Sequence, residues 1–381
     1  MSKLNDLIKE LCPNGVEYVK LEELVDYIQP AKYIVKNTNY DIKYDVPVLT
    51  AGQTFILGYT NEKDGIYYAS ADNPVVIFDD FTTSNHWVDF NFKVKSSAMK
   101  ILISKTDNLF KYIYYCISNI DYVPKEHSRQ WIQVYSQFQI PLPPLKVQEE
   151  IVRILDKFGE LEAELEAELE TRKNQYEFWR GKLLNKKNEV KKLSEVSDVI
   201  DSLHATPQYV ENGYPMIRVA DVKGGIVNTT GALRVDVETY NKFVSKYKPK
   251  KGDIIISRVG SFGNLCIVGD EDMCLGQNTS IIHPRINDKY LYYYLSSDIV
   301  QDWIKNNVNG SGYKSLSLAN INEIPIAVPS IQEQQKVANI LDQFDKLIND
   351  ISEGLPAEIE LRRQQYEYYR NKLLSFKEIQ N

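Results

Sequence analysis

Two blocks of sequence each occur twice in this chain of 381 residues. The first block, residues 143–158, ends in the run Ile-Leu-Asp-x-Phe and recurs 186 positions later at 329–344. The second block, residues 175–184, reads QYEFWRGKLL and recurs 190 positions later, at 365–374, as QYEYYRNKLL. A frame that repeats over such a distance predicts two similar domains, and hence a protein that acts on two things at once.

The repeated blocks have the apolar spacing of α-helices, because their large apolar residues recur at i, i+3, i+4 and i+7. We therefore expect two spacer helices, one within 143–188 and one within 329–381, the second interrupted near Pro356. Each leaves an apolar seam, which favours antiparallel pairing with the other over a solvated surface helix. The residues expected to form this interface are Ile154, Leu155, Phe158, Tyr176, Trp179, Ile340, Leu341, Phe344, Tyr366 and Tyr369.

The stretches between the helices are built from short apolar runs separated by turn residues, which is typical of β-strands. A short helical segment is expected at 1–16, a first globular domain at 17–142 and a second at 189–328. Both domains open alike and close with a tyrosine-rich helix, at 112–118 and 290–296. The fold class expected is α/β (α+β), with two domains separated by the helix pair and related by a pseudo-twofold repeat.

Polar side chains able to bind DNA gather in the predicted loops of both domains. Arg pairs with guanine edges, Asn and Gln pair with adenine, and Ser or Thr bond to either bases or phosphates. In the second domain these clusters include 257–264, 276–279 and 309–315. The candidate DNA-binding residues are Thr82, Thr83, Asn85, Arg129, Gln130, Arg218, Arg258, Ser261, Asn264, Asn278 and Lys314.

The overall composition restricts the function classes. The net charge is −7, and no long segment is basic, so this is not a polycation that coats nucleic acid. The four cysteines are scattered without a CxxC pair, which favours reduced thiols in a cytoplasmic protein and no structural metal. No run approaches the length of a membrane span, and the N-terminal residues lack a signal-peptide pattern.

The repeated blocks and the domain order resemble those of the specificity (S) subunit of type I restriction-modification systems, over nearly the whole chain. The resemblance implies two target recognition domains, each reading one half of a bipartite, asymmetric site in double-stranded DNA. It also implies that the helices dock two methyltransferase (M) subunits, and that restriction (R) subunits join the larger complex. It does not supply the target bases, because the recognition domains are the variable part of the family.

Motifs for catalysis are missing from the sequence. It has no base-holding Asn/Asp-Pro-Pro-Tyr/Phe motif, no glycine-rich loop for S-adenosylmethionine and no Walker A sequence. We therefore expect a non-catalytic subunit, with S-adenosylmethionine, ATP and Mg²⁺ bound by partner subunits. Two alternatives stay open at this point: a DNA-modifying enzyme with an unrecognised motif, and a binding or adhesion protein whose modules are spaced by a coiled coil.

Overall fold

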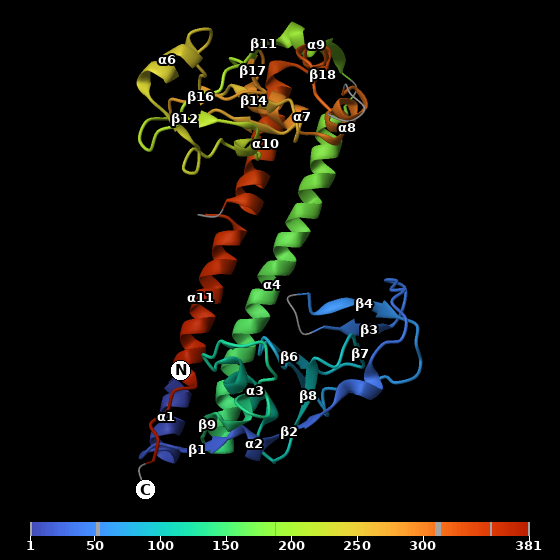
Figure 1. The fold of residues 1–381 in the computed structure, drawn as a ribbon, viewed down its shortest axis with the longest axis vertical. Coiled ribbons are helices and arrows are strands. Elements are labelled where there is room, and N and C mark those ends of the chain that lie inside the picture. Colours follow the sequence, from blue (N-terminus) through green and yellow to red (C-terminus); the bar gives the residue numbers. More distant parts are fainter. Residues whose placement is uncertain (1, 51–53, 187, 309–313, 351–352, 380–381) are drawn as a thin grey trace. The chain divides into compact units, whose positions relative to one another are not determined.

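The computed structural model describes residues 2–50, 54–186, 188–308, 314–350 and 353–379. The chain divides into two compact units, residues 1–165 with 359–381 (unit 1) and residues 166–358 (unit 2). Each unit combines strands, short helices and parts of the long helices (Figure 1). The fold is mixed α/β with an internal repeat, as the sequence predicts.

Unit 1 begins with a helix and then builds a mainly β domain that α3 closes. Its elements are α1 (Ser2–Leu11), β1 (Glu17–Lys20), α2 (Leu21–Leu24), β2 (Val25–Ile28), η1 (Pro30–Tyr33), β3 (Val46–Leu49), β4 (Ile56–Thr60), β5 (Val75–Asp79), β6 (Asn85–Val88), β7 (Lys93–Val94), β8 (Met99–Ser104), α3 (Phe110–Ser118), η2 (Tyr135–Gln137) and β9 (Gln139–Leu142). Helix α4 (Leu145–Leu184) follows and continues into unit 2.

Unit 2 repeats this order with a longer C-terminal part. Its elements are β10 (Glu189–Lys192), α5 (Leu193–Val196), β11 (Ser197–Asp201), β12 (Tyr214–Ile217), η3 (Val219–Asp221), β13 (Arg234–Val235), α6 (Val237–Val244), β14 (Ile254–Ser257), β15 (Leu265–Ile267), β16 (Cys274–Leu275), β17 (Thr279–Pro284), α7 (Asp288–Leu295), α8 (Asp298–Asn306), α9 (Leu318–Asn322), β18 (Pro325–Val328) and α10 (Ile331–Asn349). Helix α11 (Leu355–Leu373) then returns to unit 1.

The sheets of the two units have the same topology, although the sequences between the repeated blocks differ. The four-stranded sheet runs β2-β8-β5-β6 in unit 1 and β11-β17-β14-β15 in unit 2. The three-stranded sheets, β4-β3-β7 and β13-β12-β16, each combine an antiparallel and a parallel pair. The pairs β1-β9 and β10-β18 complete the match. The duplication therefore extends through the divergent domains.

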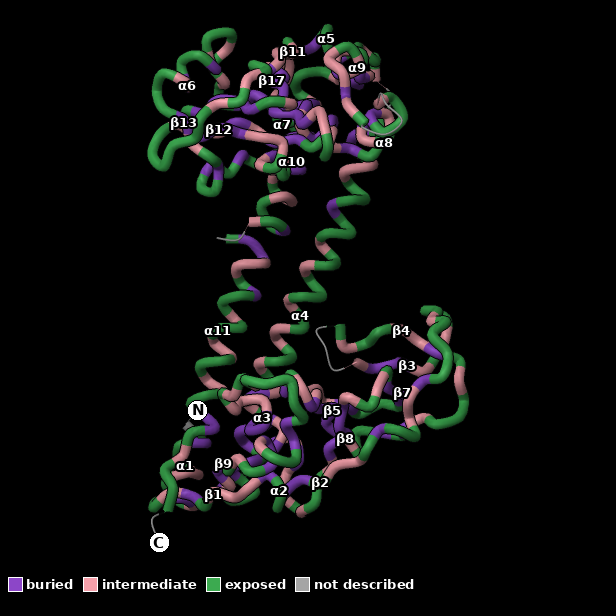
Figure 2. Tube along the Cα trace, viewed as in Figure 1, coloured by how far each residue is buried: buried purple, intermediate pink, exposed green. Residues whose placement is uncertain are grey.

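Strand β5 of unit 1 and strand β14 of unit 2 each lie inside a four-stranded sheet and are buried on both faces, which explains their unbroken apolar sequences. In β5, Val76 and Phe78 pack in the core that contains α3 and α4, whereas Val75 and Ile77 pack against the three-stranded sheet. The triplet Ile254–Ile256 of β14 alternates in the same way between two cores. Figure 2 shows the buried residues concentrated in these layers.

The long helices pair antiparallel inside each unit. In unit 1, Phe158 of α4 stacks on Tyr369 of α11 with ring centroids 5.3 Å apart. One turn further along α4, Glu162 accepts a 3.0 Å hydrogen bond from Arg363, which lies earlier in α11. In unit 2 the partner of α4 is α10, where Tyr176 lies 6.2 Å from Phe344. The two halves of α4 thus pair with two separate helices, because the second spacer is interrupted between residues 349 and 355.

Candidate nucleic-acid interface

The polar loops of unit 1 meet at the end of strand β5. The backbone carbonyl of Asp80 accepts a 2.8 Å hydrogen bond from the Gln130 amide, and its carboxylate accepts one of 2.9 Å from the Trp131 amide. Phe81 stacks on His127 with centroids 4.6 Å apart. The β5–β6 loop and the segment 127–131, which lie far apart in the sequence, therefore form one surface, termed here the first polar cluster.

Asp80 also anchors a buried ion pair beneath the first polar cluster. Its carboxylate lies 3.5 Å from the ammonium of Lys100, and both side chains are at most 1% exposed. Arg129, half exposed, approaches the same carboxylate at 3.8 Å. Burial lowers the pKa of Lys100, and the charge of Asp80 offsets part of that effect. Asp80 thus links the buried β8 strand to a loop that carries two candidate DNA-binding residues.

Unit 2 assembles an equivalent surface, the second polar cluster, at the end of β14. The Arg258 carbonyl accepts a 2.8 Å hydrogen bond from the Leu316 amide, as the Asp80 carbonyl does from Gln130. The Arg258 amide donates to the Asn278 carbonyl, also at 2.8 Å. The β14–β15 loop, residues 276–279 and residues 314–316 are thereby joined. Residues 309–313 of the third predicted cluster lie outside the described residues.

Each polar cluster contains one non-glycine residue with a positive φ. Among the described residues, Thr83 and Asn278 are the non-glycine residues with positive φ, and both have φ 62°. Asn tolerates this left-handed conformation, whereas a β-branched residue such as Thr adopts it at a cost. Strain of this kind gathers at functional sites, where the surrounding structure holds it in place.

The two candidate arginines of unit 2 are already paired with carboxylates. The Arg258 guanidinium contacts Asp201 and donates a 3.1 Å hydrogen bond to the Leu316 carbonyl, and it is only 16% exposed. Burial alone would raise the pKa of Asp201, but hydrogen bonds from His204, Arg258 and Ser280 outweigh it and hold that pKa below its ordinary value. Arg218 pairs with Asp221 at 3.1 Å.

The predicted DNA-binding residues differ in how exposed their side chains are and in whether they already form hydrogen bonds within the domain. Gln130 and Thr83 are buried, and the Gln130 amide is used by Tyr122 and Ser128. Asn85 is half-buried, and its amide oxygen accepts a hydrogen bond from Ser118. The residues with exposed side chains are Thr82, Arg129, Ser261, Asn264 and Lys314. The structure brings the candidates of each unit together, but it leaves only these five facing outward.

The first repeated block fastens the tyrosine-rich helices at their N-termini. Gln148 of α4 accepts a 3.1 Å hydrogen bond from the amide of Leu109, the N-cap residue of α3, and donates at 2.8 Å to the Pro143 carbonyl. Gln334 of α10 repeats both bonds, accepting from the N-cap residue Asn287 of α7 and donating to Pro329. Both glutamines are buried, and their side chains supply hydrogen-bond partners for backbone groups at the start of each helix.

The aspartate that occurs in both copies of the same block bonds to the middle of the tyrosine-rich helix. The Tyr115 hydroxyl of α3 donates a hydrogen bond to Asp156, and the Tyr293 hydroxyl of α7 donates one of 2.8 Å to Asp342. Burial, followed by the bond to the carboxylate, raises the pKa of each tyrosine well above its usual value. The tyrosines are therefore hydrogen-bond donors that fix helix orientation.

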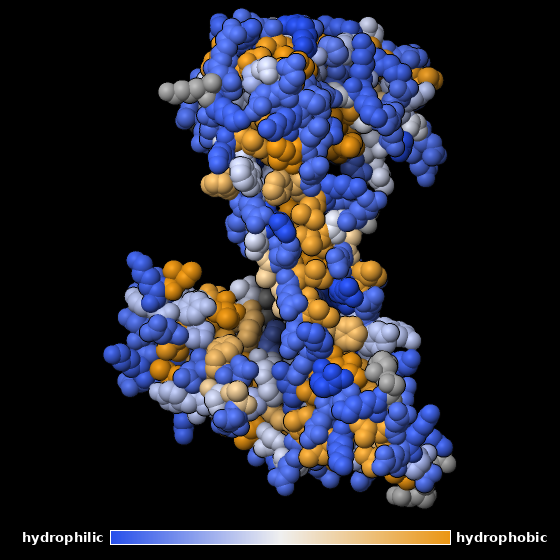
Figure 3. Space-filling view, turned by 180° about the vertical axis from the view of Figure 1, so that it is seen from behind, coloured by the Kyte–Doolittle hydropathy of each residue, from blue (hydrophilic) through white to orange (hydrophobic). Residues whose placement is uncertain are grey.

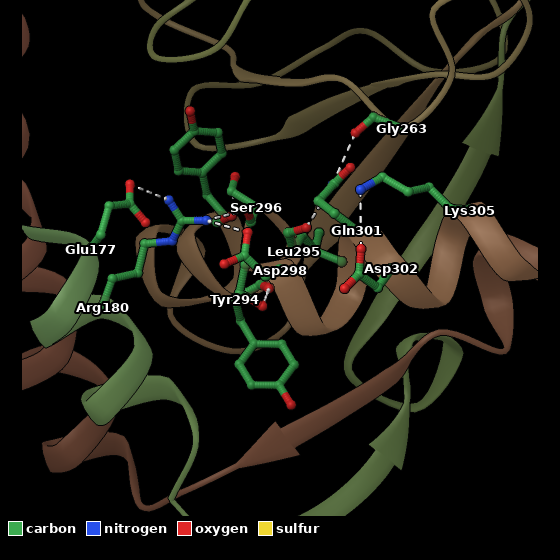
Figure 4. A network of polar contacts seen from close by, with 12 residues as sticks. Glu177, Arg180, Gly263, Tyr294, Leu295, Ser296, Asp298, Gln301, Asp302 and Lys305 are labelled. Atoms are coloured by element: carbon green, nitrogen blue, oxygen red, sulfur yellow. Dashed lines mark hydrogen bonds and ion pairs between the residues drawn. The ribbon is translucent and has the colours of Figure 1, made fainter. Parts of the chain in front are cut away.

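The second repeated block completes the contact at the C-terminus of the same helix. Arg180 of α4 donates a 2.8 Å hydrogen bond to the carbonyl of Ser296, the C-cap residue of α7, and pairs with Glu177 and Asp298 (Figure 4). Arg370 of α11 donates at 3.0 Å to Asn119, the C-cap residue of α3. A cation at this position also complements the helix dipole. We call each set of Gln, Asp and Arg a clamp.

Each clamp combines residues from both copies of the repeat. The clamp of unit 1 takes Gln148 and Asp156 from the first copy but Arg370 from the second, and the clamp of unit 2 takes the complementary residues. Sequence reasoning missed this role, because it used the apolar positions of the repeat. The signal was present, since glutamine, aspartate and arginine are identical in both copies.

Most of the predicted helix-interface residues lie in the hydrophobic cores or against them. Leu155, Leu341 and Tyr176 are buried, and the partly buried residues packed against them are Ile154, Phe344, Tyr366 and Tyr369. Ile340 is half-buried on α10. Trp179 is 39% exposed and its ring contacts are with Phe178 and Lys182 of its own helix. Figure 3 shows hydrophobic side chains gathered on the surface of the helices.

Other site types find little support in the described part of the chain. No group of three or more His, Cys, Asp or Glu side chains there is arranged to hold a metal ion. The four cysteines, all buried, are free thiols. No helix among the described residues combines the length and apolarity needed to cross a bilayer.

Comparison with known proteins gives a consistent result. The family model described as "Type I restriction modification DNA specificity domain" matches residues 13–171 and 185–361. The specificity subunit of the Escherichia coli type I restriction enzyme EcoR124I/EcoR124II is 42% identical, covering 99% of this chain and 98% of the relative. A putative type I specificity subunit of Haemophilus influenzae is 29% identical, covering 97% and 98%.

Solved structures share the fold at low sequence identity. The S subunit of a type I restriction-modification system from M. genitalium superposes with a TM-score of 0.58 at 16% identity, covering 95% of this chain and 97% of that one. A second structure, described as addressing complex assembly and conformational transition of the type I R-M system, gives the same TM-score at 15% identity and covers 96% and 98%. The two-domain arrangement with a long helix is therefore shared with both.

Proposed function

This chain belongs to the family of type I restriction-modification DNA specificity subunits, and from that premise we propose that each of its units reads one half of a split DNA site. As a specificity subunit it is the DNA-recognition component of a restriction-modification system and is not itself an enzyme. The recognition domain of unit 1 would read the 5′ half-site, and that of unit 2 the 3′ half-site.

The observation that carries this proposal is the pair of polar clusters at equivalent positions of the same sheet topology. Each begins where β5 or β14 ends, each joins segments that are distant in the sequence, and each contains one residue with φ 62°. Exposed Arg, Asn, Ser and Thr side chains at such a surface are the donors and acceptors that read base edges in the major groove. The clusters differ in composition, as two readers of different half-sites require.

Arg129 and Asn264 supply a matched test, because each lies in one cluster and has an exposed side chain. The genes for the chain and its methyltransferase would be expressed in a host without this system, and methylated motifs mapped by long-read sequencing. Arg129→Ala should relax the first half-site only, and Asn264→Ala the second only. Each lost base contact should cost about 1–3 kcal/mol of discrimination. Relaxation of both halves by either variant would contradict the assignment.

We also propose that the helices dock two copies of a methyltransferase subunit. Phe178 and Tyr368, equivalent residues of the second repeated block, are 63% and 60% exposed. Lys182 and Lys372, also equivalent, lie 5.8 Å above these two rings. Exposed aromatic residues of this size mark interaction sites. Because the surface occurs twice, it fits two copies of one partner.

The stoichiometry of the complex tests this partner assignment. The chain co-expressed with its methyltransferase should purify with two copies, whereas Phe178→Ala or Tyr368→Ala should leave one copy bound, as measured by mass photometry. Exposed Leu361→Ala, on α11 outside the repeated block, is the control and should retain two copies. Retention of both copies by the double variant would refute the docking surface.

Three further proposals follow from family membership. S-adenosylmethionine, ATP and Mg²⁺ would be bound by the partner subunits, and restriction subunits would join the complex. DNA as the substrate would place the protein in the cytoplasm.

A further inference from the structure

Both candidate arginines near the second polar cluster are already used in ion pairs within unit 2. Arg258 and Arg218 are paired with Asp201 and Asp221, so their charge is largely neutralised within the domain. Phosphate contacts from Lys and Arg supply much of the affinity of any DNA-binding protein. Unit 2 must therefore hold phosphate with other residues if it reads a half-site.

The segment 242–251 contains five lysines in ten residues. Lys250 lies 5.6 Å above the Tyr247 ring, and the other four fall into two groups. Lys248 pairs with Asp272 and Lys251 with Asp270, each at 2.8 Å. Lys242 and Lys246 are exposed, and no carboxylate of the described residues lies within ion-pair distance of either. Two uncompensated positive charges thus stand four residues apart, at the end of α6.

Lys242 and Lys246 line a hollow of about 300 Å³. Its wall includes Ser202, which is 92% buried and whose hydroxyl has no hydrogen-bond partner among the described residues. A buried hydroxyl without a hydrogen-bond partner is unfavourable, and a polar group bound in the hollow would relieve that cost if it reached the Ser202 oxygen. The rest of the wall is mixed, with Phe243 and Leu275 contributing apolar surface.

The hollow adjoins the second polar cluster. Asp201 and His204 line it, and the Asp201 carboxylate is the one that holds Arg258. The Ser202 amide donates to the Thr279 carbonyl, one residue beyond Asn278. The negative charge of Asp201 is matched by Arg258, which leaves the lysines as the net charge of the hollow. Leu275, the residue before the loop 276–279, also lines the hollow, so a ligand here would lie beside that loop.

We propose that this hollow seats a sugar–phosphate unit of the DNA backbone beside the second half-site. The ammonium groups of Lys242 and Lys246 pair with the phosphate, and the apolar wall accommodates the carbon face of the deoxyribose. The contact fixes the position of the duplex while the polar cluster reads its bases. The inference rests on the proposed function and adds to it a binding site within unit 2.

The salt dependence of DNA binding tests the proposal. The chain purified with its co-expressed methyltransferase subunits would be titrated with a duplex carrying the mapped motif and with an unrelated duplex. The double variant Lys242→Ala/Lys246→Ala should lose affinity for both duplexes by the same factor. Because the two lysines hold one phosphate, the slope of log K against log salt should fall by about 0.9. This slope change alters the affinity ratio of variant to wild type about 3.5-fold between 50 and 200 mM salt.

The lysines that are already paired give a matched control. Lys248→Ala/Lys251→Ala removes the same two charges from the same segment but should leave the slope unchanged. An equal fall in both variants would show a general charge effect and overturn the site, as would an unchanged slope in the first variant. A loss confined to the motif duplex would indicate base contacts and also overturn it. If wild type did not prefer the motif duplex, the proposed function itself would fail instead.

Discussion

The clamp glutamines make an unequal prediction for the two units. Gln148→Ala removes three hydrogen bonds of a fully buried amide, with Leu109, Asn108 and Pro143. Gln334→Ala removes two, with Asn287 and Pro329. At about 1 kcal/mol for each bond, docking of α3 in unit 1 should weaken by about 3 kcal/mol and docking of α7 in unit 2 by about 2 kcal/mol.

Hydrogen–deuterium exchange measures this effect separately for each helix. If docking controls local opening, α3 amides in Gln148→Ala should exchange about 150-fold faster than in wild type. In Gln334→Ala the α7 amides should exchange about 30-fold faster, and in each variant the other tyrosine-rich helix should keep its wild-type rate. Gln343→Ala, an exposed site on α10, is the control and should change neither.

Two results would refute the reasoning about the clamps. Equal acceleration of α3 and α7 in either single variant would mean that the glutamines stabilise the whole chain and not one docking contact each. Unchanged rates in both variants would mean that water or neighbouring groups replace the lost bonds. A methylome of the same variants adds a functional test, in which Gln148→Ala should weaken recognition of the first half-site before the second.

Three further perturbations test other parts of the structure. Lys100→Met should destabilise unit 1 by about 3–5 kcal/mol, because it leaves the buried Asp80 carboxylate without its main counter-ion. In thermal unfolding, the double variant Lys100→Met/Asp80→Asn should recover part of this loss. A wild-type melting temperature for Lys100→Met alone would contradict the role of this ion pair. Hydrogen bonds from Arg153 and Lys3 lower the pKa of Glu150 from 4.5 to about 2, so its contribution to stability is complete above pH 4.5 and is lost as the pH falls toward 2. Urea unfolding between pH 3 and 6 should therefore vary less in Glu150→Gln than in wild type, and equal pH profiles would exclude this role. Gly15→Ala should disrupt the contact between Gly15 and Lys377, because Gly15 has φ 109° and an added Cβ would lie 2.3 Å from the Lys377 carbonyl oxygen. Gly159→Ala, on an open face of α4, should instead stabilise the protein by about 1 kcal/mol in the same unfolding assay.

Much of the frame was predictable because it depends on local patterns. The apolar spacing of the repeated blocks predicts helices, and Pro356 predicts the interruption that the structure places between α10 and α11. The short apolar runs predict the strands of both domains, and the tyrosine-rich segments predict α3 and α7. These features follow from side-chain period and turn residues, which act over a few positions and are readable in one sequence.

The site depended on contacts that no local pattern contains. Arg258 looks in the sequence like a base-reading arginine, yet the fold pairs it with Asp201, which lies 57 residues earlier. Gln130 looks like an adenine-reading side chain, yet it is buried and bonds to Tyr122. The sequence shows a lysine-rich segment, but only the structure separates the paired Lys248 from the unpaired Lys242. Whether a polar group is free or already used depends on what lies beside it.

The sequence by itself determined that the chain is a duplicated frame of helices carrying two β-rich domains. Helical periodicity acts over a few neighbouring positions, and the repeat is visible when two segments of the sequence are compared. Only the tertiary structure decided that each domain is clamped by Gln and Asp from one copy and Arg from the other. That exchange arises because α4 runs antiparallel to both α11 and α10. The first block of each copy therefore lies beside the second block of the other copy. Antiparallel pairing joins residues that are distant in sequence, and their contacts are set by packing and charge across the whole fold.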